Sequence, residues 1–295
     1  MNKTLIYGFC FFLFILSFLS NNLILLVFIL EIMVLLTITL FSHNQNVSLY
    51  NLYSSLTIYF IISALASLFM IIGWIMLIPY LFFTGILCKI GGFPFCWWIY
   101  KFYQGIDYGL ILFFNTLLKA PLLVIIIFCN VYNNNDTVSL VFVCSLIFAS
   151  IMLLNSNGSW VFFIGSNGIV SSVVLLILSS TANTVDVVVL FFLGWCYIFL
   201  FLYSVYFYNE ESNNSNYSMN NNTAFFVVFV LISFPVAAGV VYKSYTIFSL
   251  VNGISSFLVC LWVFYSLVEI FWLVNTLFFN SSFSNVDEVS NGRLY

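Results

Sequence analysis

Three lysines and one glutamate lie inside apolar sequence, and they are the residues of this chain best suited to chemistry. Lys89, Lys119, Lys243 and Glu31 each stand within a stretch long enough to cross a lipid bilayer. A cation at the bilayer centre costs at least roughly 2.5–3.5 kcal/mol. The chain has only 6 Lys and Arg in 295 residues, so we predict that these three charges are used. The use open to a lysine in a membrane is to hold and release protons.

Each of these groups also has an interpretation that needs no function. A lysine can extend to the lipid headgroups, and this alternative is stronger for Lys89 and Lys243, which lie near helix breakers, than for Lys119. Glu31 can be a protonated, silent carboxylic acid. We favour an ion pair between Glu31 and a buried lysine, because pairing reduces the cost of burying both charges and couples their titrations.

The remaining ionisable groups carry less information. Glu269 lies in the last predicted span, and the sequence leaves open whether it is functional or near the surface. Asp186 begins a predicted span, where a negative charge suits the helix N-terminus, and Asp107 is expected to cap another. His43 lies in a polar loop and is expected to be solvated. Lys101 follows a run of aromatic residues and is expected to extend to the membrane surface.

Composition identifies the elements that must position these groups. Hydrophobic residues make up 64% of the chain and charged residues 5%, against about 25% charged residues in soluble domains. Unpaired backbone groups are costly in lipid, and long apolar runs do not alternate as barrel strands do, so we expect an all-α polytopic membrane protein. A span needs about 20 apolar residues, which predicts spans at 4–20, 22–42, 53–75, 77–100, 106–131, 137–154, 158–180, 184–208, 223–250 and 252–279.

A weak internal repeat divides these ten predicted spans. Gly85 and Lys89 have the same spacing as Gly239 and Lys243, and both segments contain or adjoin helix-breaking glycine or proline. We therefore predict one transmembrane domain at 1–280, made of two inverted five-helix repeats at about 1–131 and 137–280. A polar tail follows at 281–295.

Pro121 follows Lys119 in the fifth predicted span. A proline in mid-span breaks a helix, and the freed carbonyls are expected to bind the Lys119 ammonium group.

Several function classes lack their signals. The net charge is −3, and the seven cysteines form no C-x-x-C pair, so neither nucleic-acid binding nor a metal site is expected. The sequence also contains no Gly-rich phosphate loop, no H-E-x-x-H and no flavin or quinone signature. We expect no cofactor or metal on this chain.

The segment that begins at Lys89 reads KIGGFPFCWWIYKFYQG. It resembles the pattern K-x-G-x-x-P-F-H-x-W-x-P-x-x-x-Q-G of the subunit 2 family of NADH:ubiquinone oxidoreductase (respiratory complex I), an antiporter-like membrane subunit. Three further landmarks of that family occur in its order: LEIM around Glu31, LKAP around Lys119, and FPVAAGVVYK ending at Lys243.

The sequence also departs from that family. Cys96 stands where the family has His, Tyr100 where it has Pro, and one Pro is missing before Gly239. The segment at 163–170, FIGSNGIV, lacks the histidine usual there. Ten spans are fewer than bacterial relatives have. These departures weaken any role for histidine in proton transfer on this chain.

The resemblance implies a proton channel in the membrane arm of complex I, with Glu31 and Lys89 as a switchable pair, Lys119 as the central relay and Lys243 as the onward carrier. FMN, iron–sulfur clusters and ubiquinone are then expected in other subunits. The partners implied are other membrane-arm subunits, including antiporter-like ones, together with membrane lipids, protons and water. A chain rich in Phe, with Asn-rich loops, is typical of an organelle gene, so the inner mitochondrial membrane is the expected location.

Two alternatives remain. A stand-alone cation/proton antiporter has the same fold, but we see no added carboxylate-rich ion site near the lysines. A structural spacer with decayed pumping residues is argued against by the three lysines and Glu31.

Overall fold

The computed structural model shows a helical protein over the residues that it describes, which are 3–41, 49–104, 108–129, 135–156, 159–213, 238–253 and 256–276. No strand occurs within these ranges, so the predicted all-α class is confirmed for them. The helices are α1 (Lys3–Leu19), α2 (Leu23–Phe41), α3 (Leu49–Ile75), α4 (Pro79–Ile90), α5 (Trp97–Gln104), α6 (Tyr108–Thr116), α7 (Lys119–Cys129), α8 (Asn135–Leu154), α9 (Trp160–Thr181), α10 (Thr184–Asn213), α12 (Ala238–Gly253) and α13 (Ser256–Val274).

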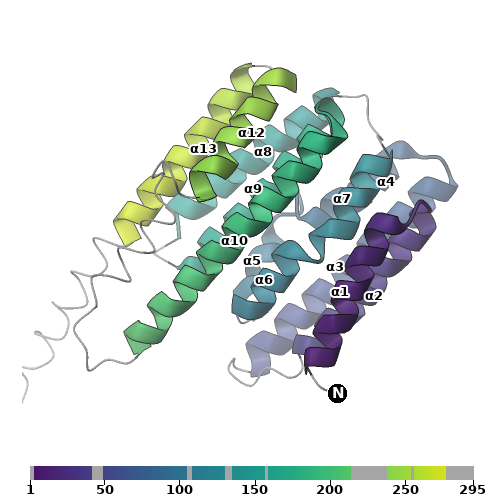
Figure 1. Ribbon diagram of the computed structural model, residues 1–295, viewed down its shortest axis with the longest axis horizontal. Helices are drawn as coiled ribbons and strands as arrows, with labels where there is room; N and C mark the ends of the chain where they lie inside the picture. Colours follow the sequence, from purple (N-terminus) through teal and green to yellow (C-terminus); the bar gives the residue numbers. More distant parts are fainter. Residues whose placement is uncertain are drawn as a thin grey trace, which may run out of the picture.

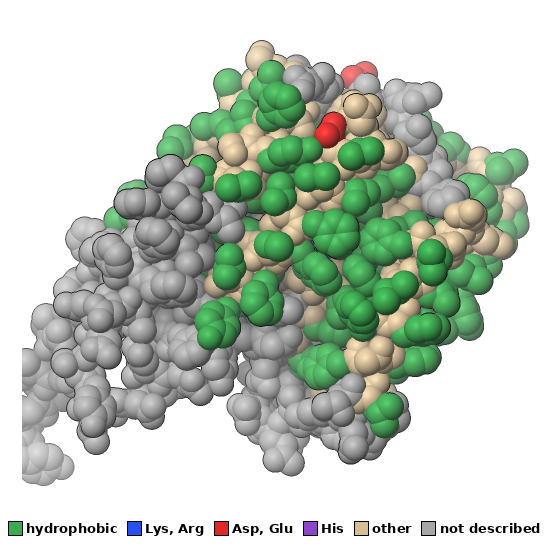
Figure 2. All heavy atoms as spheres, viewed as in Figure 1, with side chains coloured by type: hydrophobic (Ala, Val, Ile, Leu, Met, Phe, Trp, Pro, Cys, Tyr) green, Lys and Arg blue, Asp and Glu red, His purple; other side chains and the backbone are tan. Residues whose placement is uncertain are grey.

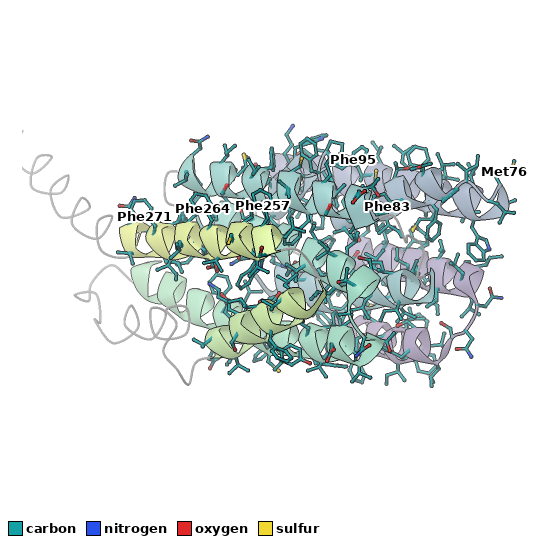
Figure 3. All side chains as sticks on the ribbon, turned by 90° about the horizontal axis from the view of Figure 1, so that it is seen from above. Met76, Phe83, Phe95, Phe257, Phe264 and Phe271 are labelled. Carbon is teal, nitrogen blue, oxygen red and sulfur yellow. The ribbon has the colours of Figure 1, made fainter. Side chains whose placement is uncertain are left out.

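Much of the helical surface is apolar, as expected of a membrane protein. Within the described residues, 6 helices are long and apolar enough to cross a membrane, namely α2, α3, α8, α9, α10 and α13. Shorter apolar helical segments lie at Leu5–Leu19, Pro79–Ile90 and Phe113–Ile127. Figure 2 shows hydrophobic side chains over most of the described part of one face. Phe257, Phe264 and Phe271 follow one another along the outer side of α13 (Figure 3), and each is more than half exposed.

The helices form two groups that meet along α9 (Figure 1). In the first group, α3 packs along α4, and α2 packs against α1, α3 and α7. In the second, α8 packs against α13, and α10 against α12. Helix α9 contacts α4, α5 and α7 on one side and α8, α10 and α12 on the other. Its buried residues include Gly165, Ser166 and Gly168, which let neighbouring helices approach closely.

The fourth predicted span is broken, as its glycines and proline indicate. Helix α4 ends at Ile90, and Gly91 adopts the left-handed conformation with φ of 70°. The Gly92 N–H donates to the Leu87 carbonyl oxygen at 3.0 Å, which completes the helix end. Helix α5 then begins at Trp97. This break places Lys89 in the last turn of α4, inside the protein.

The fifth predicted span is also broken, a few residues before its proline. Helix α6 ends at Thr116 and α7 begins at Lys119, so the break precedes Pro121. Pro121 lies in the first turn of α7, where a missing N–H removes no intrahelical hydrogen bond. Because Pro121 has no N–H to give to the Leu117 carbonyl oxygen four residues earlier, a break at 117–118 agrees with the predicted effect of the proline. The actual break makes Lys119 the first residue of a helix within the protein.

The predicted limits of the other spans agree with the helices to within a few residues where the structure describes them. The exceptions are α3, which begins four residues early, α13, which begins four residues late, and α10, which extends to Asn213. The ninth predicted span is described only from Ala238 onward. The predicted breaker Pro235, the loop residue His43, the cap Asp107 and the tail at 281–295 lie outside the described residues.

We expect Gly91→Ala to destabilise the protein. Left-handed backbone costs a residue with a Cβ atom about 1–2 kcal/mol, and a Cβ at Gly91 would overlap the side chain of Ile99. The control is Gly8→Ala in α1, where nothing lies within 4 Å of the added atom. The measurement is the monodisperse fraction of detergent-solubilised protein after heating. Equal heat resistance of the two variants would contradict the expectation.

Candidate functional site

Glu31 and Lys89 form an ion pair between α2 and α4, in which the lysine is buried. Lys89 Nζ lies 2.7 Å from Glu31 Oε1, and it donates to Ser63 Oγ of α3 at 2.6 Å. The Lys89 side chain is 6% exposed, whereas the Glu31 side chain is 31% exposed. The predicted pairing of Glu31 with a buried lysine is therefore confirmed, and Lys89 does not extend to the surface. Ser63 supplies a third polar group from a third helix.

Local sequence explains how Lys89 reaches this position. It lies in the last turn of α4, where the helix dipole favours a cation. Gly85 lies one turn earlier on the same face, and a Cβ there would come within 2.8 Å of Met70 and Ala66 of α3. The glycine of the Gly-x-x-x-Lys pattern therefore lets α4 pack closely on α3, which brings Lys89 to Ser63.

Lys119 has different partners from those predicted. Its Nζ donates to the Gly168 carbonyl oxygen at 2.7 Å and to Ser171 Oγ at 3.0 Å, both on α9. The carbonyl that binds it therefore belongs to another helix, not to the helix that contains Pro121. Among the described residues, no Asp or Glu oxygen lies within 4.0 Å of Lys119. Lys119 is thus a half-buried lysine whose hydrogen-bond partners are neutral groups.

Lys243 and Glu269 form a second ion pair, in which the carboxylate is buried and the lysine half-buried, and the sequence analysis did not predict it. Lys243 Nζ of α12 lies 2.7 Å from Glu269 Oε2 of α13. The other carboxylate oxygen accepts hydrogen bonds from Asn167 Nδ2 at 3.1 Å and from the Tyr197 hydroxyl at 3.3 Å. The Glu269 side chain is 3% exposed. Glu269 is therefore a buried residue whose carboxylate contacts Lys243, Asn167 and Tyr197, and it does not lie at the surface.

A signal for this pair is present in the sequence. Lys243 and Glu269 are 26 residues apart, on two helices joined by a short connection. An opposite charge at the matching depth of the next helix is the feature that predicts such a pair.

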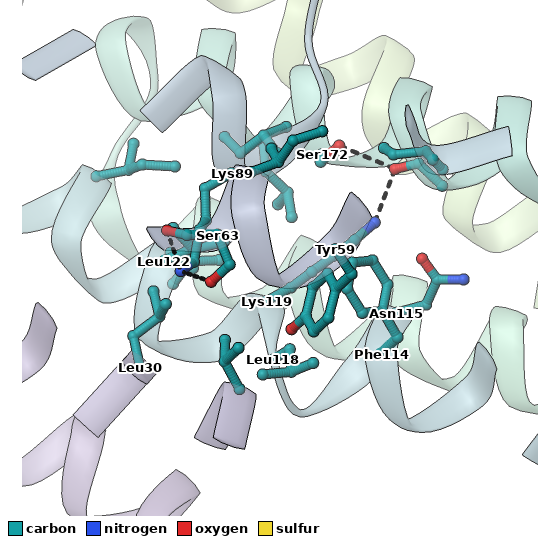
Figure 4. Close-up of a pocket in the computed structure, with 18 of the residues that line it drawn as sticks. Leu30, Tyr59, Ser63, Lys89, Phe114, Asn115, Leu118, Lys119, Leu122 and Ser172 are labelled. Carbon is teal, nitrogen blue, oxygen red and sulfur yellow. Dashed lines mark hydrogen bonds between the residues drawn. The ribbon is translucent and has the colours of Figure 1, made fainter. Parts of the chain in front are cut away.

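Two cavities adjoin these groups. The first contains both Lys89 and Lys119, with Ser63, Tyr59 and Gly168 among its lining residues (Figure 4). The second is lined by Lys243, Glu269, Asn167, Ser171 and several aromatic residues. In each cavity, the volume that the centre of a water molecule can occupy is about 40 Å³. A cavity needs roughly 10–15 Å³ of such volume to hold one water. Both cavities can therefore hold a few waters beside ionisable groups.

The other residues singled out in the sequence have ordinary surroundings. Asp186 lies in the first turn of α10, as predicted, and accepts a hydrogen bond from the Tyr245 hydroxyl at 2.9 Å. Lys101 is exposed and lies 5.0 Å from the centre of the Trp97 ring. Cys96 is buried. The described residues include no cluster of three His, Cys, Asp or Glu that could hold a metal ion.

The arrangement resembles known proteins in fold. No model of a protein family matches the sequence, and no curated protein matches it. Among solved structures, a chain of "Respiratory complex I from Thermus thermophilus with bound Aureothin" has a similar fold, with a TM-score of 0.71 at 15% sequence identity. The match covers 88% of this chain and 66% of that chain. At this identity the similarity shows a shared helical fold, over most of the present chain.

Proposed function

We propose that this chain is the antiporter-like subunit 2 of proton-pumping NADH:ubiquinone oxidoreductase, in the inner mitochondrial membrane, and that it provides one proton channel. The observation that carries the proposal is the cavity lined by two lysines, the buried Lys89, which is paired with Glu31, and the half-buried Lys119. The shared fold with a chain of a bacterial complex I supports it. The Pro-Phe and Gln-Gly elements of the segment that begins at Lys89 favour subunit 2 over its sister subunits, which share the buried lysines.

The architecture that goes with this function is ten spans in two inverted repeats, within a domain at 1–280 and before a polar tail at 281–295. Two features support it. The span of Lys89 is broken, and Lys89 and Lys243 each pair with a glutamate from another helix. In transporters with inverted repeats, broken helices near the membrane midplane build the ion sites.

In the proposed mechanism, Glu31 and Lys89 act as the switch. While the carboxylate lies 2.7 Å away, it stabilises the charged form of Lys89. When a charge on a neighbouring subunit draws Glu31 aside, Lys89 becomes an uncompensated buried cation, which is costly. It then releases its proton through cavity water to Lys119, and Lys243 carries it onward. The partial exposure of Glu31 leaves it open to such an influence.

Redox chemistry takes place elsewhere in this proposal. FMN, iron–sulfur clusters and ubiquinone belong to other subunits, and this chain binds no cofactor. Its partners are other membrane-arm subunits, including the other antiporter-like ones, and membrane lipids. The coupling between quinone reduction and this channel is electrostatic, and each end of the coupling acts on the other.

We expect Lys119→Met to leave the complex assembled but to depress proton pumping. Removing a positioned proton carrier slows proton transfer by about 10²-fold. The measurement is protons translocated per NADH oxidised in sealed vesicles. The control is Lys101→Met, which removes an exposed lysine. Unchanged pumping per NADH in Lys119→Met would exclude the relay role.

We also expect this chain to migrate with a large NADH-oxidising complex. Gently solubilised mitochondrial membranes would be separated on a native gel, stained for NADH oxidation and analysed for peptides of this chain. If the peptides occur only in a small species without NADH activity, the stand-alone cation/proton antiporter replaces our proposal. Ion exchange in vesicles would then be the next assay.

A further inference from the structure

We propose that the Ser171 hydroxyl passes protons from Lys119 to the Lys243–Glu269 pair, so that Ser171 and Glu269 are proton-carrying residues of the channel. This inference rests on the proposed function, since it concerns the path between the central relay and the onward lysine.

Ser171 stands between the two cavities. Its Oγ lies 3.0 Å from Lys119 Nζ, and Lys119 lines the first cavity. Ser171 itself lines the second cavity. A hydroxyl can accept one hydrogen bond while it donates another. Ser171 therefore connects a lysine of the first cavity to the interior of the second.

The hydroxyl has a resting state and an active state. At rest, its hydrogen points to the Gly168 carbonyl oxygen at 3.1 Å, the same oxygen that binds Lys119. Rotation about the Cα–Cβ bond turns this hydrogen toward the second cavity. The Oγ lone pairs then remain available to the Lys119 ammonium group. Such a rotation of one small side chain can open or close the connection.

Glu269 is the acceptor that the second cavity offers. It is buried, and its oxygens are held by Lys243, Asn167 and Tyr197. The cavity has space for about three waters by the measure used above. Asn167, Ser171, Lys243 and Glu269 supply the 2–4 polar partners that a buried water needs. Water can thus bridge Ser171 and Glu269.

The proton transfer balances as follows. One N–H bond of the Lys119 ammonium breaks and an O–H bond forms at Ser171, while the original Ser171 O–H bond breaks and its proton passes to cavity water. The water gives a proton to the Glu269 carboxylate, which becomes a neutral acid. Lys119 is left as a neutral amine. Lys243 then lacks a charged partner and releases its own proton onward, after which it takes up the proton from Glu269.

Asn167 is the positioning residue for this acceptor. Its Nδ2 donates to Glu269, and its Oδ1 accepts from the Tyr265 hydroxyl at 3.0 Å. Asn167 precedes Gly168, whose carbonyl oxygen holds Lys119. One turn of α9 therefore sets the positions of both the donor and the acceptor. This turn lies in the segment where the family has a histidine and this chain has none.

The test uses the assembled complex in proteoliposomes, with protons translocated per NADH oxidised as the readout. Ser171→Ala should lower this ratio by the share of protons that this channel carries, as Lys119→Met does, because it removes the hydroxyl. Ser171→Thr should restore it, since threonine keeps the hydroxyl. Glu269→Gln should lower it as Ser171→Ala does. The control is Ser180→Ala, on the same helix, where the hydroxyl bonds only the Ile177 carbonyl.

Lys119→Met in the same assay separates the two proposals. If Lys119→Met abolishes pumping while Ser171→Ala pumps normally, the Ser171 path is overturned and the proposed function stands. If Ser171→Ala and Ser171→Thr are equally impaired, packing rather than the hydroxyl is responsible, and the path is again overturned. If Lys119→Met pumps normally, the proposed function itself fails. The Ser171 variants leave both ion pairs intact, so the test does not depend on Glu269→Gln assembling.

Discussion

The cost of keeping a charged side chain away from water determines which helices lie side by side in this protein. An uncompensated buried charge is so unfavourable that it must meet an opposite charge or hydrogen-bonding groups. Lys89 joins α4 to α2 and α3 through Glu31 and Ser63. Lys243 joins α12 to α13 through Glu269. Lys119 joins α7 to α9 through the Gly168 carbonyl and Ser171.

The broken helices follow from the same constraint. A continuous helix uses all its interior backbone groups for its own hydrogen bonds, and it carries its ends to the membrane surface. The breaks after Ile90 and before Lys119 place a helix C-terminus and a helix N-terminus inside the protein. Lys89 lies at the C-terminal end, which favours its charge, and Lys119 at the N-terminal end, which does not. The two lysines of one cavity thus differ in how firmly the protein holds their charge.

Helix α9 supplies hydrogen-bond partners to both Lys119 and Glu269. It is buried on both sides, and it presents small or polar residues at 165–172 to several neighbours. Tyr100 stands where the family pattern that this sequence resembles has proline. Its ring packs over Gly165, and its hydroxyl oxygen lies 3.1 Å from Ser166 Oγ. The substitution at Tyr100 and the unusual segment of α9 are therefore in contact. The polar groups of α9 in this segment are an amide, hydroxyls and a backbone carbonyl, and they contact Lys119 on one side and Glu269 on the other.

Much of this could be predicted from the sequence, for reasons that are local. Apolar runs determine the helices, because a span depends only on the residues along it. Gly91 and Pro94 mark the end of α4. Gly91 has no Cβ and so adopts the left-handed conformation that ends a helix, and Pro94 cannot continue a helix. Lys89, Lys119, Lys243 and Glu31 stand out because charge is rare in this chain.

The tertiary structure alone decided which hydrogen-bonding groups lie beside these charged side chains. The bond from Lys119 to Gly168 and the contact that places Ser171 between two cavities join residues 49 and 52 positions apart. Such contacts depend on how helices pack, because no property of either segment alone specifies its neighbour.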